Sequence, residues 1–342
     1  MPATSPDSSE GGVEVRAFEA EDEARVLENL TAAFGRWPLD VDGVDASEFF
    51  RWKHMASPFG PSMLLVAEVD GDVVGFGAWL RWRLRARGQT LEALRGVDFG
   101  VHPSYRGRRI QVHLIGAASE RFSSDTALTF STPNERSRPG ALRSGRRQVG
   151  SLPSFVRPHR PLRGAARRIV ARRSEISQPP AVDAETAAEV LRDGDGVSQL
   201  IALAREPDDR LTTARDIDYL RWRYGRFADY RAVRTAADDQ PAGLAIFRLQ
   251  RHGSAWVSSV CELLVEQNDL RIARRLLRQV RKAAAVDFVT CGFPTRRDAA
   301  MCGFVRSPGG TLLVARPLHQ NLIPDPTRRV SWAMSIGDLE LL

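Results

Sequence analysis

The sequence predicts a chain of two α/β halves built to the same plan, on three observations. First, 342 residues exceed what one compact core usually needs and suit two domains. Second, the segment Phe50-Arg51-Trp52-Lys53 returns about half the chain later as Leu220-Arg221-Trp222-Arg223. Third, each copy is followed by the same succession of strands, one helix and a further strand. These observations predict an internal repeat.

The first half contains four segments with the apolar character of strands and, between the third and the fourth, one segment with helical spacing. The turn at Asp70-Gly71-Asp72 is typical of a hairpin between two of the strands. Pro133 and Gly145 bracket a short helix after the last strand. The predicted strands are Met63–Ala67, Val73–Trp79, Leu94–Val101 and Ala127–Ser131, and the predicted helix is Ile110–Ala118.

The second half repeats this order with a weaker first strand. Gly243 takes the place of Gly75, and Pro294 and Gly303 take those of Pro133 and Gly145. The predicted strands are Arg231–Arg234, Leu244–Leu249, Ala255–Val265 and Phe288–Cys291, and the predicted helix is Leu270–Ala283.

Composition indicates a globular protein. Its excess of arginine indicates either an anionic ligand or a coding bias toward arginine. The formal net charge is +7, and Lys53 and Lys282 are the only lysines. Three cysteines without paired spacing predict buried reduced thiols and no metal site. No apolar run approaches the length of a membrane span.

The segments outside the two halves are polar or basic. Residues 1–12 predict a disordered lead without the features of a secretory signal, so a cytoplasmic location is expected. Residues 157–182 are rich in arginine and proline and predict a linker. Because this linker lacks interleaved aromatic residues, nucleic acid is an unlikely partner and ranks third among the hypotheses.

The most informative segment runs from Leu94 to Leu114, where a strand ends in an arginine-rich turn and a helix begins. Pro103 stops the strand, and the spacing of Ile110 and Leu114 follows one helical face. Backbone amides from Arg106 to Gln111 then lie at a helix N-terminus, where the helix dipole and nearby guanidinium groups favour an anion. The expected ligand of this turn is a pyrophosphate group.

This turn resembles the acyl-CoA-binding motif of the GNAT superfamily of acetyltransferases, whose pattern is Arg/Gln-x-x-Gly-x-Gly/Ala. Arg106 fills the first position, whereas Arg109 and Gln111 stand where small residues are usual. The resemblance implies two tandem GNAT-like domains of the α/β (α+β) class, each with a mixed, mostly antiparallel sheet flanked by helices. It also implies acetyl-CoA as co-substrate. The implied cofactor-binding residues are Phe99, Gly100, Val101, Arg106, Gly107, Arg108, Arg109, Ile110, Gln111 and Asn134.

The resemblance further implies where chemistry occurs. The backbone of Phe99–Val101 would face the thioester. Asp98 is the first choice for the base, and His102, Glu92 and Glu48 are the other candidates. The family's usual tyrosine acid has no counterpart, because Ala141 stands four residues before Gly145.

The expected organisation is an acetyl-CoA-binding domain over 13–156, a degenerate second domain over 183–318 and a docking tail over 319–342. The second domain has Glu266–Leu270 where the first has its arginine-rich turn, so it is not expected to bind CoA. The expected activity is acetyl transfer to an amine of a small molecule, sugar or antibiotic. The alternative is a CoA-binding sensor or scaffold without turnover. Oligomeric state and acceptor stay open.

Overall fold

The computed structural model describes residues 12–39, 43–159, 178–204, 207–237 and 240–339. The predicted disordered lead, apart from Gly12, and the central part of the predicted linker, residues 160–177, lie outside these ranges. No helix within them combines the length and the apolarity needed to cross a membrane. All three cysteines are buried.

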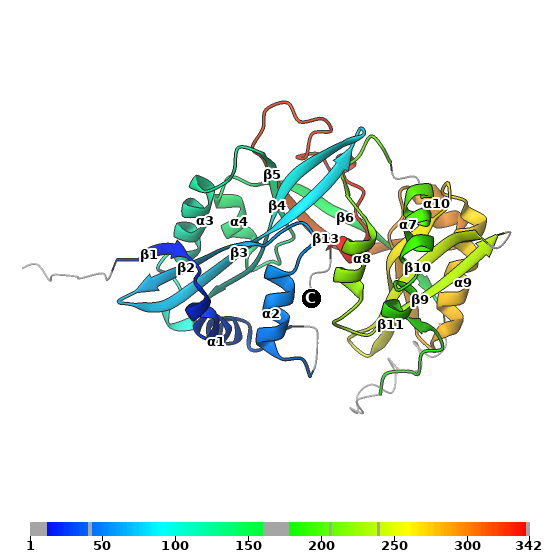
Figure 1. The fold of residues 1–342 in the computed structure, drawn as a ribbon, viewed down its shortest axis with the longest axis horizontal. Coiled ribbons are helices and arrows are strands. Elements are labelled where there is room, and N and C mark those ends of the chain that lie inside the picture. Colours follow the sequence, from blue (N-terminus) through cyan, green and yellow to red (C-terminus); the bar gives the residue numbers. More distant parts are fainter. Residues whose placement is uncertain (1–11, 40–42, 160–177, 205–206, 238–239, 340–342) are drawn as a thin grey trace, which may run out of the picture.

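One sheet runs through the described chain and carries both halves (Figure 1). Its strand order is β1-β2-β3-β4-β5-β13-β6-β12-β11-β10-β9-β7, with β8 beside β3. Only the pairs β4–β5 and β11–β12 are parallel, so the sheet is mixed and mostly antiparallel, as predicted. The first-half strands are β1 (Glu14–Ala17), β2 (Met63–Val69), β3 (Asp72–Ala86), β4 (Gln89–Val101), β5 (Thr126–Ser131) and β6 (Arg147–Pro158).

The strand order reads as a palindrome about the β13–β6 pair, which is the signature of a two-fold repeat. Each half contributes its last strand to the sheet of the other half: β13 lies against β5, and β6 lies against β12. The repeat by itself did not predict this exchange. The second-half strands are β7 (Glu185–Thr186), β8 (Thr212–Thr213), β9 (Tyr230–Ala237), β10 (Gln240–His252), β11 (Ala255–Val265), β12 (Phe288–Cys291) and β13 (Val305–Pro317).

The helices divide between the two faces of the sheet (Figure 1). The outer face carries α3 (Ile110–Glu120) and α4 (Arg138–Arg143) in the first half, and α9 (Leu270–Ala283) and α10 (Arg296–Met301) in the second. A single large core on the other face joins the two halves. The elements on or beside it are α1 (Glu23–Phe34), α2 (Ala46–Met55), α6 (Ala187–Val190), α7 (Gly194–Leu203), α8 (Ile217–Tyr224) and α11 (Ile336–Leu339), with 3-10 turns at 20–22, 103–105 and 329–331.

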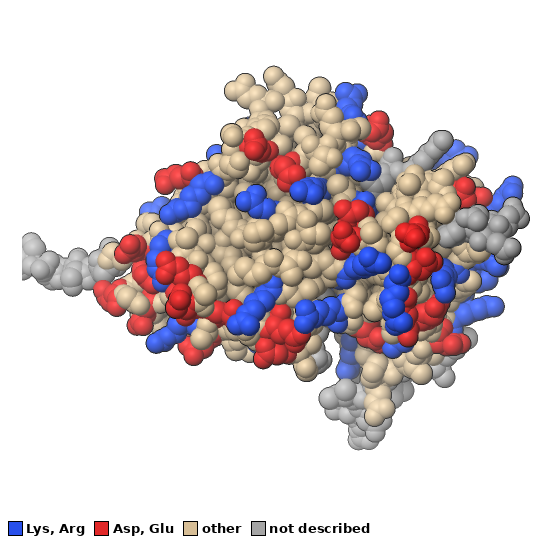
Figure 2. All heavy atoms as spheres, viewed as in Figure 1, with Lys and Arg blue, Asp and Glu red and all other residues tan. Residues whose placement is uncertain are grey.

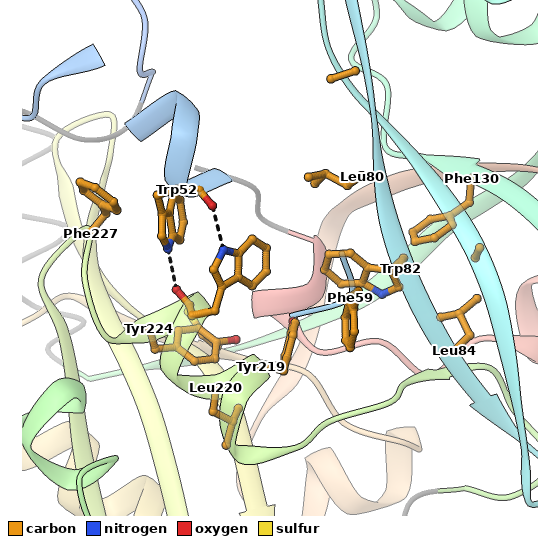
Figure 3. Packing of buried hydrophobic residues seen from close by; sticks show 14 of the residues in the cluster. Trp52, Phe59, Leu80, Trp82, Leu84, Phe130, Tyr219, Leu220, Tyr224 and Phe227 are labelled. Atoms are coloured by element: carbon orange, nitrogen blue, oxygen red, sulfur yellow. Dashed lines mark hydrogen bonds between the residues drawn. The ribbon is translucent and has the colours of Figure 1, made fainter. Parts of the chain in front are cut away.

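Helices α2 and α8, which carry the repeated Arg-Trp segment, meet at the centre of the molecule. The indole Nε1 of Trp52 donates to the carbonyl of Trp222 at 3.0 Å, and the indole Nε1 of Trp222 donates to the carbonyl of Trp52 at 3.1 Å (Figure 3). The rings stack with centroids 5.3 Å apart. Both tryptophans are buried. The reciprocal bonds place the repeat's approximate two-fold axis between them.

The repeated glycines Gly75 and Gly243 serve the same close packing of helix on strand. A β-carbon on Gly75 would lie 2.5 Å from Ile110 of α3, and one on Gly243 would lie 2.7 Å from Ile272 of α9. No side chain fits at either position without displacing the helix. Helices α3 and α9, which connect the two strands of each parallel pair, therefore pack against the sheet in the same way.

Candidate functional site

The arginine-rich turn forms a run of outward-facing backbone amides between β4 and α3. Gly107 and Arg109 both adopt the left-handed backbone conformation, with φ of +91° and +58°. Within the described chain, no acceptor takes the amide hydrogens of residues 107–111. Successive unpaired amides at a helix N-terminus make an anion-binding concavity.

The left-handed conformation of Arg109 explains why the GNAT pattern favours glycine at that position. An arginine there is strained but leaves the backbone path intact. The side chain of Gln111 packs toward α4, since a β-carbon on Gly140 would lie 2.6 Å from its Oε1 atom. Arg106 donates to the carbonyl of Ala33 at 3.2 Å, at the end of α1. These contacts leave the amides at the surface.

The adjacent strand β4 separates from β5 part-way along its length. The parallel pairing runs from Glu92–Thr126 to Arg95–Phe130 and then stops. Asp98 has φ of +49°, and the β3–β4 register shifts between Phe76 and Ala78. Beyond this bulge the predicted thioester-facing backbone, Phe99–Val101, is not paired with β5, whereas Gly100 and Val101 stay paired with β3. The place where β4 and β5 part, beyond the Arg95–Phe130 pair, is here named the splay.

Asp98 points toward α2 and is held there by two neighbouring residues. Its carboxylate lies 2.9 Å from the Lys53 ammonium and 3.2 Å from Nε2 of His54. Burial opposes its ionisation, but Lys53 and His54 outweigh burial and lower the pKa of Asp98 well below its usual range. Burial lowers the pKa of Lys53 and of His54, against the opposing effect of Asp98. The sequence reasoning singled out Asp98 and missed both partners.

The other predicted candidates lie in separate places. His102 accepts from the amide of Ser104 at 3.3 Å and so caps the 3-10 turn before the amide run. Glu92 belongs to the end of the β4–β5 pair that is away from the splay and binds Arg83. Glu48 forms an ion pair with Arg226 of the second half.

Asn134 follows β5 and caps the turn into α4. Its Oδ1 atom accepts from the amides of Arg136 at 3.0 Å and Ser137 at 2.9 Å. Its Nδ2 group has no partner among the described residues, so capping leaves a donor available beside the splay. Ala141, at the position of the family's tyrosine, is buried in α4.

The C-terminal segment reaches the splay from the second half. Arg95, the last residue of β4 paired with β5, donates to the carbonyls of Asp338 and of Leu339, the latter at 2.9 Å. Its guanidinium lies over the rings of Trp82 and Phe130. Burial lowers the pKa of Arg95 to about 10. Helix α11 is therefore packed directly under the first-half site.

The second half keeps the opening between its parallel strands but engages the amides of its turn. The pairing of β11 with β12 stops at Val260–Cys291, and a cavity of about 320 Å³ lies there. The amides of Gln267, Asn268 and Asp269 donate to backbone carbonyls, and the Asp269 carboxylate caps α9. This turn offers neither free amides nor positive charge to a pyrophosphate.

Comparison with known proteins matches the half of the chain that carries the amide run to a family of acetyltransferases. The family model for the acetyltransferase (GNAT) domain matches residues 14–137. No curated protein sequence matches the chain.

Three solved structures share the fold over most of the chain, at identities that show the fold alone. A probable N-acyltransferase from Enterococcus faecalis is 12% identical with a TM-score of 0.62, covering 90% of this chain and 72% of that one. A GCN5-related N-acetyltransferase from Anabaena variabilis is 15% identical with a TM-score of 0.60, covering 90% and 73%. The N-myristoyltransferase of Saccharomyces cerevisiae, solved with myristoyl-CoA, is 13% identical with a TM-score of 0.57, covering 98% and 86%.

The splay, the amide run and these comparisons agree. Residues 14–137 match the GNAT acetyltransferase domain, and the chain shares its overall fold with solved N-acetyltransferase and N-myristoyltransferase structures.

Proposed function

We propose that the protein is a cytoplasmic acyltransferase that moves an acyl group from acyl-CoA to the amine of an acceptor. Acetyl-CoA is the donor that the family implies. The observation that carries the proposal is the run of unpaired amides at residues 107–111 directly beyond the splay. The amides would hold the pyrophosphate, and the splay would admit the pantetheine arm.

The reaction is a direct attack. The amine nitrogen bonds to the thioester carbonyl carbon, the carbon–sulfur bond breaks, and the thiolate leaves with the electron pair. The amine loses one proton and the thiolate takes up one proton, so charge balances. A backbone N–H within Phe99–Val101 would stabilise the developing oxyanion.

Asp98 and His102 stay the proposed proton acceptors, with different constraints. Asp98 lies on the α2 side, and its lysine-paired carboxylate has a low proton affinity. His102 lies nearer the phosphate end, and its Nδ1 already accepts from Ser104. Loss of kcat in Asp98→Asn with unchanged CoA affinity would favour Asp98. The same result in His102→Gln would favour His102.

Binding of acetyl-CoA is the direct test. Calorimetric titration of the full chain should give micromolar affinity, and Gly107→Asp should abolish it, because the substitution adds a carboxylate and strains a left-handed residue. Gly116→Ala on α3 is the matched control, since a β-carbon there meets nothing within 4 Å. An absence of binding by the unaltered chain would overturn the proposal.

A sensor or scaffold without turnover is the second candidate. The buried Ala141 favours it, because this position supplies no proton to the thiolate. Such a protein would bind CoA and acetyl-CoA with similar affinity and release no free thiol in the presence of amines.

The face of the molecule shown in Figure 2 does not favour nucleic acid as the acceptor. On the face shown in Figure 2, acidic and basic side chains are interspersed and form no continuous basic surface. A polyanion needs such a surface.

A further inference from the structure

A buried arginine without a counter-ion among the described residues lies beside the splay. Arg146, just before β6, is 6% exposed. One of its terminal nitrogens donates to Oγ of Ser144 at 2.8 Å, whereas its Nε atom has no partner among the described residues. Its charged neighbour is Arg316, another cation, and burial together with Arg316 lowers the pKa of Arg146 to about 10. A buried charge normally has a partner, so this one is incomplete.

The guanidinium of Arg146 lies at the closed end of the splay. One of its nitrogens is 3.4 Å from the place where a β-carbon on Gly96 would be, and Gly96 is the first residue of β4 beyond the β4–β5 pairing. The ring of Phe99 lies over the same glycine, at 3.2 Å from that point. Trp79 pairs with Gly96 across β3–β4, and its indole N–H also lacks a partner in the described chain. Two buried donors, Nε of Arg146 and the indole N–H of Trp79, therefore lack an acceptor among the described residues.

We propose that Arg146 binds a carboxylate at the end of the acyl group, so that the donor is the CoA thioester of a short dicarboxylic acid. A planar guanidinium matches a carboxylate through paired hydrogen bonds, and Ser144 already fixes its orientation. This inference rests on the proposed function. It changes only the group transferred: the same carbon–nitrogen bond forms, the same carbon–sulfur bond breaks, and the distal carboxylate is unaltered.

The proposed carboxylate site at Arg146 lies apart from the phosphate-binding amides and from the side of the sheet where the acceptor would bind. The phosphate-binding amides follow the open end of the splay, and at about 3.3 Å per residue Gly96 lies roughly 16 Å along the strand from Val101. The acceptor side is marked by Asp98 and α2, whereas Arg146 shares the opposite face with Phe99 and Trp79. An acyl group anchored at the bulge points toward the closed end, where Arg146 lies.

The test is calorimetric titration of the full chain with succinyl-CoA and with butyryl-CoA, which has an acyl group of the same carbon number and no charge. Succinyl-CoA should bind roughly 10- to 100-fold more tightly, as expected for a charge-assisted, desolvated hydrogen-bonded pair. Arg146→Met should bind both thioesters with equal affinity. Arg146→Lys should keep part of the preference, because lysine retains the charge but lacks the planar guanidinium that forms paired hydrogen bonds. Arg147→Met, an exposed neighbour on β6, should keep all of it.

The outcomes distinguish this inference from the proposed function. Equal affinity for the two thioesters in the unaltered chain would overturn the inference and leave acyl transfer standing. Failure of both thioesters and of CoA to bind would overturn both. A preference for succinyl-CoA that persists in Arg146→Met would place the carboxylate elsewhere and also overturn the inference. A thermal melt shows whether Arg146→Met is folded, and since it removes an uncompensated buried charge, its stability should not fall.

Discussion

Glu262 of β11 makes the stability of this protein depend on pH near neutrality. It is buried at 2% exposure and contacts Arg215 at 3.0 Å, Tyr224 at 2.7 Å and Ser335 at 2.9 Å. Burial is the main cause that raises its pKa from 4.5 to about 7; Arg215 opposes the shift and the Asp338 carboxylate adds to it. The folded state therefore favours the protonated form. Stability is highest below pH 4.5 for this group and falls as pH rises through about 7.

Replacement by glutamine removes the titration while keeping a side chain of the same shape. At 1.36 kcal/mol per pKa unit, the shift corresponds to about 3 kcal/mol in total, of which about 2.5 kcal/mol develops between pH 5 and pH 8. The free energy of unfolding of Glu262→Gln relative to the unaltered chain should therefore rise by about 2.5 kcal/mol over that interval. Only this change with pH is predicted, because the contacts of the glutamine with Arg215 and Tyr224 also differ from those of the protonated acid by an amount that does not depend on pH.

Urea unfolding at pH 5 and pH 8, followed by tryptophan fluorescence, measures the difference. Glu92→Gln is the control, because its carboxylate is 41% exposed and belongs to a surface ion pair, for which little effect is expected. A Glu262→Gln difference that stays constant within about 0.5 kcal/mol would refute the assignment of a desolvated acid at this position.

Three further predictions concern the centre of the molecule and the turn. Trp222→Phe removes one of the two reciprocal indole bonds and should lower the free energy of unfolding by about 1–2 kcal/mol in urea; an unchanged midpoint would contradict its role at the axis. Asp98→Asn leaves the Lys53 ammonium buried without its counter-ion and should cost about 3–5 kcal/mol, most of which Lys53→Met should restore in the double variant; additive losses would argue against the pair. Gly107→Val should cost about 1–3 kcal/mol through backbone strain alone, because open space surrounds the position; a thermal melt no lower than that of Gly116→Ala would contradict this.

Much of the local structure follows from sequence pattern. The strand Phe288–Cys291 and the helix Leu270–Ala283 have the predicted bounds, and the helix after the arginine-rich turn begins at Ile110 as expected. These segments have strong periodicity and clear stop signals, so local pattern is sufficient. The predicted strand Val73–Trp79 is longer in the structure, where β3 continues to Ala86, because Trp82 and Leu84 pack in the core and keep the alternation going.

The backbone of the candidate site could be predicted from the sequence, whereas the pairing of its charged side chains could not. The sequence predicted unpaired amides from Arg106 to Gln111, because glycine, proline and helix-start signals are local. The structure agrees for residues 107–111, whereas the amide of Arg106 donates to the carbonyl of Pro103 at 3.4 Å. Arg146 carried no signal in a chain where arginine is common, and the partners of Asp98 lie on a helix far from it in sequence. Whether an ionisable residue is paired depends on what burial brings beside it.

The sequence by itself determined that this protein has two related halves, which segments form strands and helices, and where a turn with unpaired amides follows a strand. Hydrophobic period and turn chemistry are local and are written residue by residue. Tertiary structure alone decided the exchange of β6 and β13 between the halves, the ion pair of Asp98 with Lys53, and the unpaired Arg146 beside the splay. Strand partners and electrostatic partners are chosen by global packing, because any strand edge can pair with another and any buried charge takes its character from its surroundings.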